Sequence, residues 1–267
     1  MRIKGVFESR VVVGVLLLAF MAPAAWAESA EEKGLAIAQE GERRQDGFGD
    51  FRAEMKMVLR NRQGQESVRY IRLRSIEVPG DGDKSLSIFD EPADVKGTAM
   101  LTYTHKTEPD DQWLYLPALK RVKRIASRNK SGPYMGSEFA YEDISSQEVE
   151  KYTYKYLRDE ACGDMSCFVI ERDPVDKYSG YTRQIVWLDK TEYRPMKIEF
   201  YDRKNALLKT LTQSNYQKYL ENHWRPGEMF MENHQTGKTT TIYWTNYQFR
   251  TGLTERDFRV ANLKRAK

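Results

Sequence analysis

The residues that could perform acid–base, nucleophilic or metal chemistry are scattered along this chain of 267 residues. Its histidines, His105, His223 and His234, stand alone, with no HxH, HExxH or paired-cysteine spacing that would hold a metal. No GxSxG motif marks a nucleophilic serine. Because adjacent residues on a strand point to opposite faces, we interpret Asp110-Asp111 as turn residues and Glu142-Asp143 as cap or surface charges. We therefore predict a protein that is not an enzyme and that needs no cofactor or metal.

The two cysteines, Cys162 and Cys167, have four residues between them and strand-like runs on either side. In an oxidising compartment we expect them to form a disulfide that closes this turn. A loop this short would add about 2 kcal/mol of stability in the chain-entropy model. The alternative is a redox-active pair, which usually has two intervening residues.

Residues 1–27 have the features of a secretory signal peptide. Arg2, Lys4 and Arg10 form a basic start, residues 11–20 an apolar run, and residues 25–27 a small-x-small cleavage site. The apolar run is too short to span a bilayer, which needs about 20 residues. No cysteine stands at the cleavage point to carry a lipid anchor. We therefore expect cleavage near Ala27 and a soluble periplasmic protein.

The remaining residues, 28–267, have a suitable length for one all-β domain. The whole chain contains 43 basic and 39 acidic residues, so its charges nearly balance. Bulk charge therefore indicates neither a nucleic-acid binder nor a protein that collects acidic ligands, and export argues further against nucleic acid. Any electrostatic function must come from a local cluster.

One helix and a long series of strands must position these residues. Residues 29–44 are predicted to be helical, since Ser29 suits the N-cap and Leu35 and Ala38 fall at helical spacing. From residue 48 the apolar period becomes two, which predicts half-buried antiparallel strands joined as a meander into one large, strongly curved sheet. The expected strands are residues 48–60, 65–78, 84–89, 99–106, 111–116, 149–158, 167–171, 181–188, 193–201, 206–220, 224–233 and 238–250, and residues 254–258 are expected to form a last helical turn.

Methionines at alternating strand positions indicate an apolar face inside this curve. Flexible thioethers suit a cavity that accepts variable guests, although they would equally fill an irregular core. The candidate cavity residues are Met55, Met57, Leu59, Met196, Ile198, Phe200, Met229 and Met231.

Residues 131–145 place an apolar patch on a glycine-punctuated loop. Such a loop could open as a lid with hinge-like residues at its base, or it could be a fixed plug of the barrel end. The candidate lid residues are Pro133, Tyr134, Met135, Gly136, Phe139 and Tyr141.

The block QWLYLPALKRVKRI, followed by GPYMGSEFAYEDI, strongly resembles the LolA-like outer-membrane lipoprotein-sorting proteins, in the branch often encoded beside RND-type (MMPL) exporters. The resemblance extends over nearly the whole mature chain and includes DFRAEMKMVLRNRQG, IEFYDRKNALLKTL and WRPGEMFMEN. It implies an incomplete antiparallel β-barrel, or half-barrel, with an N-terminal helix and short helices covering the concave face. It also implies a hydrophobic cavity for acyl chains.

The function that the resemblance implies is a monomeric carrier of lipoprotein acyl chains or lipid. The carrier would shuttle its cargo across the periplasm towards an outer-membrane acceptor, together with an inner-membrane RND/MMPL-type exporter. A phospholipid or a hopanoid-like lipid would fit the same cavity. The alternative function is a non-carrier accessory subunit that docks on the exporter and stabilises or gates it.

A dense basic cluster follows the aromatic strand at residues 111–116. It is either a strand edge kept basic to prevent aggregation between sheets, or a docking surface for an acidic face of the exporter or for anionic headgroups. The candidate docking residues are Lys120, Arg121, Lys123 and Arg124, with Arg128 and Lys130 beside them.

Overall fold

The computed structural model describes residues 1, 5 and 28–266, so the predicted signal peptide and its cleavage site lie outside the described residues. Helix α1 (Ala30–Arg43) begins at the predicted N-cap, where Ser29 and Glu32 bond reciprocally in a capping box. Its buried positions are Gly34 and Ile37, whereas Leu35, which falls at helical spacing, is 39% exposed. A Cβ at Gly34 would lie 2.7 Å from the Lys155 backbone, and this close approach requires glycine.

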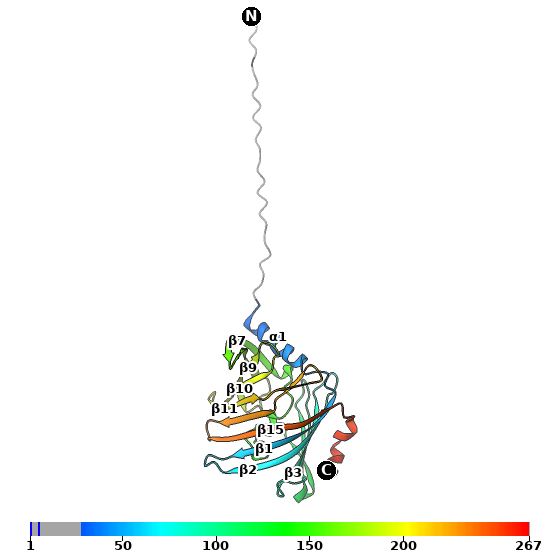
Figure 1. Cartoon of the computed structure of the whole chain (residues 1–267). Coiled ribbons are helices and arrows are strands. Elements are labelled where there is room, and N and C mark those ends of the chain that lie inside the picture. The colour runs from blue at the N-terminus through cyan, green and yellow to red at the C-terminus, as the bar shows by residue number, and fades with distance from the viewer. Residues whose placement is uncertain (2–4, 6–27, 267) are drawn as a thin grey trace.

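Thirteen strands form one antiparallel sheet that curves strongly without closing (Figure 1), which confirms the predicted fold class. The strand order is β6-β5-β4-β3-β2-β1-β15-β14-β11-β10-β9-β8-β7. The strands are β1 (Asp50–Arg60), β2 (Glu66–Ile76), β3 (Lys84–Glu91), β4 (Ala99–Tyr103), β5 (Asp111–Leu116), β6 (Arg121–Ile125), β7 (Tyr152–Cys162), β8 (Met165–Pro174), β9 (Tyr181–Asp189), β10 (Pro195–Asp202), β11 (Leu207–Ser214), β14 (Glu228–Asn233) and β15 (Lys238–Phe249). A separate two-stranded sheet pairs β12 (Gln217–Tyr219) with β13 (His223–Arg225).

The strand order shows that the chain is not a continuous meander, as the sequence had indicated. β6 and β7 are consecutive in the chain but lie at opposite edges of the large sheet. The connection between them, residues 126–151, must therefore cross from one edge to the other. It contains four 3₁₀ turns: η2 (Ser127–Asn129), η3 (Tyr134–Gly136), η4 (Tyr141–Asp143) and η5 (Val149–Lys151). We call residues 126–151 the crossover.

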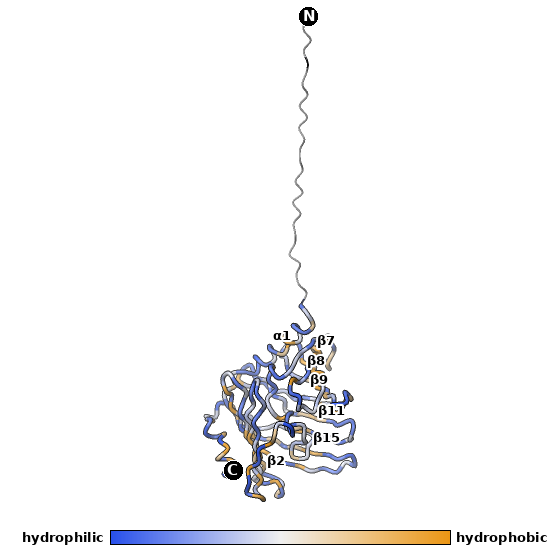
Figure 2. The backbone as a smooth tube through the Cα atoms, turned by 180° about the vertical axis from the view of Figure 1, so that it is seen from behind, coloured by the Kyte–Doolittle hydropathy of each residue, from blue (hydrophilic) through white to orange (hydrophobic). Residues whose placement is uncertain are grey.

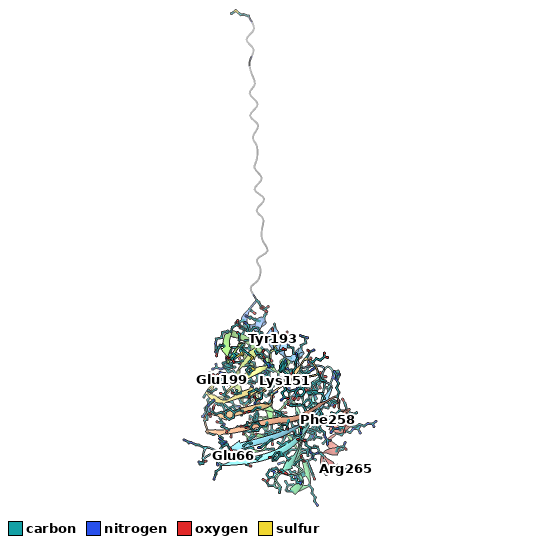
Figure 3. The ribbon with its side chains drawn as sticks, in the orientation of Figure 1. Glu66, Lys151, Tyr193, Glu199, Phe258 and Arg265 are labelled. Atoms are coloured by element: carbon teal, nitrogen blue, oxygen red, sulfur yellow. A yellow bond between two sulfur atoms is a disulfide. The ribbon has the colours of Figure 1, made fainter. Side chains whose placement is uncertain are left out.

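Apolar side chains are buried on both faces of the sheet. The consecutive residues Met100 and Leu101 of β4 belong to different clusters, because strand neighbours point to opposite faces. The main cluster fills the concave face and includes Met100, Phe139 and Ile198. On the outer face of β3 and β4, the C-terminal turns η6 (Glu255–Phe258) and η7 (Val260–Arg265) contribute the buried Phe258 (Figure 3).

The disulfide between Cys162 and Cys167 closes the β7–β8 hairpin, as predicted. Cys167 is fully buried in an outer-face cluster with Val169 and Trp187. Apolar and polar residues mix along the strands instead of forming long apolar runs (Figure 2). Within the described part of the chain, no helix has the length and apolarity that crossing a bilayer requires.

Candidate functional site

A cavity of about 620 Å³ lies on the concave face of the sheet. Volumes of this order are typical of sites that bury small ligands. Helix α1 covers this cavity and contributes Ala38 and Gly41 to its lining. Tyr193 also lines it and lies near α1 in Figure 3. A second cavity of about 290 Å³ shares Phe51 and Met229 with the first. The concave interior therefore holds two neighbouring cavities.

Five neighbouring strands build the apolar wall of the larger cavity. Because every second side chain of a strand faces the concave side, each strand contributes one or two residues. The wall contains Ile170 of β8, Val186 and Leu188 of β9, Ile198 and Phe200 of β10, Leu211 of β11 and Met229 of β14, with Trp244 of β15 beyond them. The curvature of the sheet and the alternation of side chains along its strands together produce this apolar pocket.

The residues predicted to line a cavity lie in three different places. Ile198, Phe200 and Met229 line the larger cavity, and Met55 and Met57 line the smaller one with Met229. Leu59 and Met231 pack in the same concave core but line neither cavity. Met196 instead packs with Cys167 on the outer face, because a register shift between Pro195 and Lys197 interrupts the alternation along β10.

The candidate lid lies inside the concave interior. Tyr134 and Phe139 are each 1% exposed, and the Tyr134 ring packs 5.9 Å from the Phe89 ring. Met135 and Tyr141 are half-buried and also pack against the concave core, whereas Pro133 and Gly136 are exposed. Residues 131–145 therefore connect the two halves of the sheet across its concave face.

Hydrogen bonds fix this segment to several strands. The Arg69 guanidinium donates to the Met135 carbonyl, and the Glu138 amide donates to Thr240 Oγ1 at 3.0 Å. Asn233 Nδ2 donates to Glu138 Oε2 at 2.7 Å. Thr240 and Asn233 lie beside the turn between β14 and β15, whereas Trp244, farther along β15, lines the larger cavity. We call the region where residues 133–141 contact Asn233 and Thr240 the plugged end of the concave interior. We call the region of the larger cavity, which Trp244 lines, the hollow end.

A buried ion pair joins the plugged end to β11. The Lys209 ammonium donates to Asp143 Oδ2 at 2.6 Å and to the Glu138 carbonyl at 2.8 Å, and both charged side chains are 4% exposed. Asp143 also accepts bonds from the Ala140 amide and the Tyr181 hydroxyl. Of the two predicted alternatives, cap or surface charge, the structure shows Asp143 as a buried capping residue.

Glu142, the other member of this predicted pair, is also largely enclosed. Its carboxylate accepts bonds from the Gly180 amide and the Ser179 hydroxyl, each at 2.8 Å. Burial raises its pKa, and the Asp143 charge adds to that shift. The two carboxylates thus bond to different elements and form no shared acid–base pair.

At the hollow end, the charged side chains that line the cavity are mainly acidic. Glu148 is 7% exposed, and burial followed by the charges of Asp83 and Glu42 raises its pKa to about 7. Burial, followed by the Glu77 charge, raises the pKa of Asp83 to about 6. The acidic lining residues are Glu42, Asp46, Glu77, Asp81, Asp83, Asp143 and Glu148, and the basic ones are Lys106, Arg172 and Arg225.

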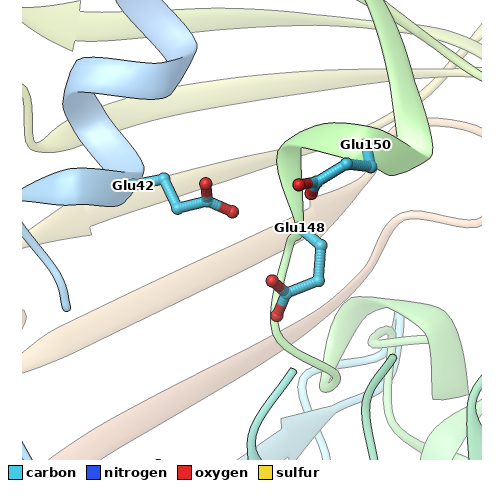
Figure 4. Close-up of side chains that lie close together, drawn as sticks. All are labelled: Glu42, Glu148 and Glu150. Atoms are coloured by element: carbon cyan, nitrogen blue, oxygen red, sulfur yellow. The ribbon is translucent and has the colours of Figure 1, made fainter. Parts of the chain in front are cut away.

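Two of these residues, Glu42 and Glu148, converge with a third glutamate, Glu150, between α1 and η5. Carboxylate oxygens of Glu42, Glu148 and Glu150 lie within 4.8 Å of one another (Figure 4). Lys106 Nζ lies 4.0 Å from Glu42 and 3.8 Å from Glu150. Among residues 28–266, no group donates a hydrogen bond to the Glu148 carboxylate and no cation lies within 4.0 Å of it. Carboxylates could hold a cation here, and Lys106 already places an ammonium beside two of them.

Arg225 is the basic residue that lines both cavities. Its guanidinium donates to Gln45 Oε1 and to the Trp224 carbonyl, and it lies 5.5 Å from the Phe48 ring centre and 5.9 Å from that of Phe51. Burial lowers its pKa. Neither Arg225 nor Glu148 was among the site residues predicted from the sequence. The acidic groups come from α1, the turn after β2 and the crossover, so no local motif contains them.

The candidate docking residues lie on or beside the edge strand β6. Lys120, Arg121, Lys123 and Arg124 are exposed, and Arg124 pairs with Asp111 of β5. Since β6 pairs only with β5, its other edge has no strand partner in the large sheet. Lys130 does not belong to this surface, because its ammonium pairs with Asp176 at 2.9 Å.

An open antiparallel sheet that holds a helix-roofed cavity on its concave face defines the LolA-like class. A family model described as "Uncharacterized protein" matches residues 81–265. A putative outer membrane lipoprotein-sorting protein domain from Vibrio parahaemolyticus is 60% identical, with a TM-score of 0.86 over 88% of this chain and 99% of that one. A DUF1329 family protein from Desulfovibrio piger is 30% identical, with a TM-score of 0.84 over the same shares. The chain therefore belongs to the DUF1329 family of outer-membrane lipoprotein-sorting domain proteins.

A LolA superfamily protein from Nitrosomonas europaea shares the fold at 22% identity, with a TM-score of 0.69 over 88% of this chain and 99% of that one. No curated protein sequence matches the chain. The predicted resemblance to LolA-like proteins is confirmed.

Proposed function

We propose that the protein is a monomeric periplasmic carrier that binds the acyl chains of a lipoprotein or lipid at the hollow end and delivers them towards an outer-membrane acceptor. The observation that carries the proposal is the cavity of about 620 Å³ with its apolar wall of strand residues. Burying an acyl chain there would contribute about 0.8 kcal/mol per CH₂ group. The name of the Vibrio relative, a putative outer membrane lipoprotein-sorting protein domain, supports the same function. The proposal assigns no catalytic step to any residue.

Native mass spectrometry of the protein, purified without detergent from its own periplasm, tests this proposal. We expect adducts with the masses of acyl-containing molecules. Leu211→Trp should abolish them, because Leu211 lines the larger cavity and the larger ring would occupy the space of the chain. Leu207→Trp is the matched control, since Leu207 lies on the same strand but is 36% exposed and lines no described cavity. An unliganded parent protein, or adducts unchanged in Leu211→Trp, would contradict the proposal.

We also infer that the basic edge of β6 docks on an acidic face of an inner-membrane RND/MMPL-type exporter. The support is a row of exposed cations on a strand without an outer neighbour. Each exposed charge near an anionic surface contributes about 1 kcal/mol, an attraction that salt screens. Docking at this edge would leave the hollow end free for cargo.

Capture of the exporter by the immobilised protein tests the docking surface. Lys123→Glu with Arg124→Glu should weaken capture at low salt, and the difference from the parent should shrink as salt rises. Lys204→Glu with Lys238→Glu reverses two exposed charges elsewhere and should leave capture unchanged. Unaltered capture by the first variant would reject the docking surface. A stable exporter complex with an empty cavity would favour the non-carrier accessory subunit.

A further inference from the structure

The acidic groups that line the larger cavity are unevenly paired with cations and hydrogen-bond donors, and this difference bears on the headgroup of the cargo. Asp143 pairs with the Lys209 ammonium, and Asp81 Oδ2 lies 2.7 Å from His105 Nδ1. Glu77 accepts the amides of Gly47 and Gly49. These three acids therefore have partners within the chain.

Glu148 differs from them, because its carboxylate is buried and still lacks a partner among the described residues. It lines the apolar cavity, so the free carboxylate borders the space in which an acyl chain would lie. Carboxylate oxygens of Glu42 and Glu148 lie within 4.8 Å of each other. Asp83, which accepts from the Ser146 hydroxyl at 3.3 Å, lines the same cavity and carries the same charge sign. A buried carboxylate without a partner is costly unless a cation or a donor reaches it.

The cations around Glu148 contact other acceptors and do not pair with its carboxylate. Lys106 contacts Glu42 and Glu150, and Lys151 pairs with Asp110. The guanidinium of Arg225 donates to Gln45 and the Trp224 carbonyl. The position of Lys106 between two glutamates also shows that an ammonium fits the spacing of these carboxylates.

We propose that the hollow end selects an amphiphile whose headgroup carries a protonated amine, with the apolar chain in the cavity and the ammonium bound by Glu148, Glu42 and Asp83. This inference rests on the proposed carrier function and adds the headgroup class. An ammonium offers three donors and a positive charge to three acceptor groups. An anionic headgroup would instead face carboxylates of the same sign, which disfavours binding.

Displacement of the apolar fluorophore diphenylhexatriene tests the headgroup preference. The competitors are hexadecylamine, hexadecanol and hexadecanoate, which share one chain length and differ in headgroup charge. The titrations use a chelator and about pH 8, where the carboxylates are ionised and the alkylamine stays protonated. We expect hexadecylamine to displace the probe best and hexadecanoate worst, with an amine-over-alcohol preference of about tenfold, the size of a charge-assisted hydrogen bond.

Glu148→Gln should reduce the amine-over-alcohol preference to less than about threefold, since it removes the charge and keeps the shape. Hexadecanol displacement in the same variant reports whether the apolar cavity is intact. Asp83→Asn should also reduce the preference for the amine over the alcohol. It provides the test if Glu148→Gln does not fold. Glu66→Gln is the matched control, because Glu66 is exposed on β2 and lines no described cavity (Figure 3).

The outcomes separate this inference from the carrier proposal. Equal displacement by amine and carboxylate, or a full amine preference in both variants, would overturn the headgroup inference while hexadecanol binding still supported a carrier. Failure of all three competitors and of the fluorophore to bind would overturn the carrier proposal, and the headgroup inference with it.

Discussion

The plugged end and the hollow end of the concave interior share the strands β11, β14 and β15 but differ in how their polar groups are paired. At the plugged end, the Asp143 carboxylate accepts bonds from Lys209, Ala140 and Tyr181, and the segment around it is bonded to several strands. At the hollow end, Glu148 is almost as buried and has no partner among the described residues. Both carboxylates are thus buried, but Asp143 is fully paired and Glu148 is not.

β14 shows the same contrast within one strand. Met229 and Met231 face the same concave side, two residues apart, but Met229 lines both cavities and Met231 is fully buried and lines neither. The sheet itself does not create the difference. Residues 133–141 of the crossover fill one end, whereas α1 covers the other and residues 145–149 of the crossover line the cavity there. Stability should therefore depend mainly on the plugged end and ligand binding on the hollow end.

Lys209→Met should produce the largest loss of stability, because it leaves the buried Asp143 carboxylate without its cation. Breaking a buried pair by removing one partner costs about 3–5 kcal/mol. The free energy of unfolding, measured by urea denaturation with tryptophan fluorescence, should fall by this amount. Lys238→Met, at an exposed lysine, is the control and should change it by less than about 0.5 kcal/mol.

A second substitution separates the lost pair from lost packing at Lys209. Adding Asp143→Asn to Lys209→Met removes the unpaired charge, so the double variant should recover part of the lost stability. If Lys209→Met costs less than about 1 kcal/mol, the plugged end does not stabilise the sheet and the contrast between the two ends fails.

Met231→Trp and Met229→Trp should have unequal effects, although both enlarge a methionine of β14. The first overpacks a filled region and should cost about 1–3 kcal/mol of unfolding free energy. The second expands into the cavities and should cost less, while reducing the amount of bound acyl material. Urea denaturation and native mass spectrometry of both variants check this. Equal costs would indicate that the hollow end is as tightly packed as the plugged end.

Local sequence patterns predicted the sheet, the disulfide and the limits of α1, because each depends on residues close in the chain. The inward face of α1 was less predictable, since Gly34 turns towards β7 and leaves Leu35 exposed. Met196 followed the expected period of two but lies on the outer face, because a local register shift interrupts the alternation. Strand periodicity alone does not reveal such a shift.

Features that depend on distant segments could not be predicted from local patterns. The route of the crossover follows from β6 and β7 lying at opposite edges, which strand patterns alone do not specify. The carboxylates of Glu42, Asp83 and Glu148 come from three separate segments and meet only in the fold. These three residues, of which only Glu148 lacks a hydrogen-bond partner, carry the headgroup inference and were absent from the sequence-based candidates.

The smallest expected effect concerns the pH dependence of the hollow end. Folding raises the pKa of Glu148 from 4.5 to about 7, so the folded protein keeps a proton that the unfolded chain has released. The contribution of Glu148 to the free energy of unfolding should therefore fall as pH rises from about 4.5 to 7, and Glu148→Gln should remove this contribution. We expect the variant to exceed the parent by about 1–2 kcal/mol at about pH 8, reduced by water at the cavity mouth, and to match it at about pH 4.5. Glu66→Gln is the control in both urea titrations. An equal difference at both pH values would mean that Glu148 is paired or solvated after folding, and the distinction between the two ends would then rest on packing alone.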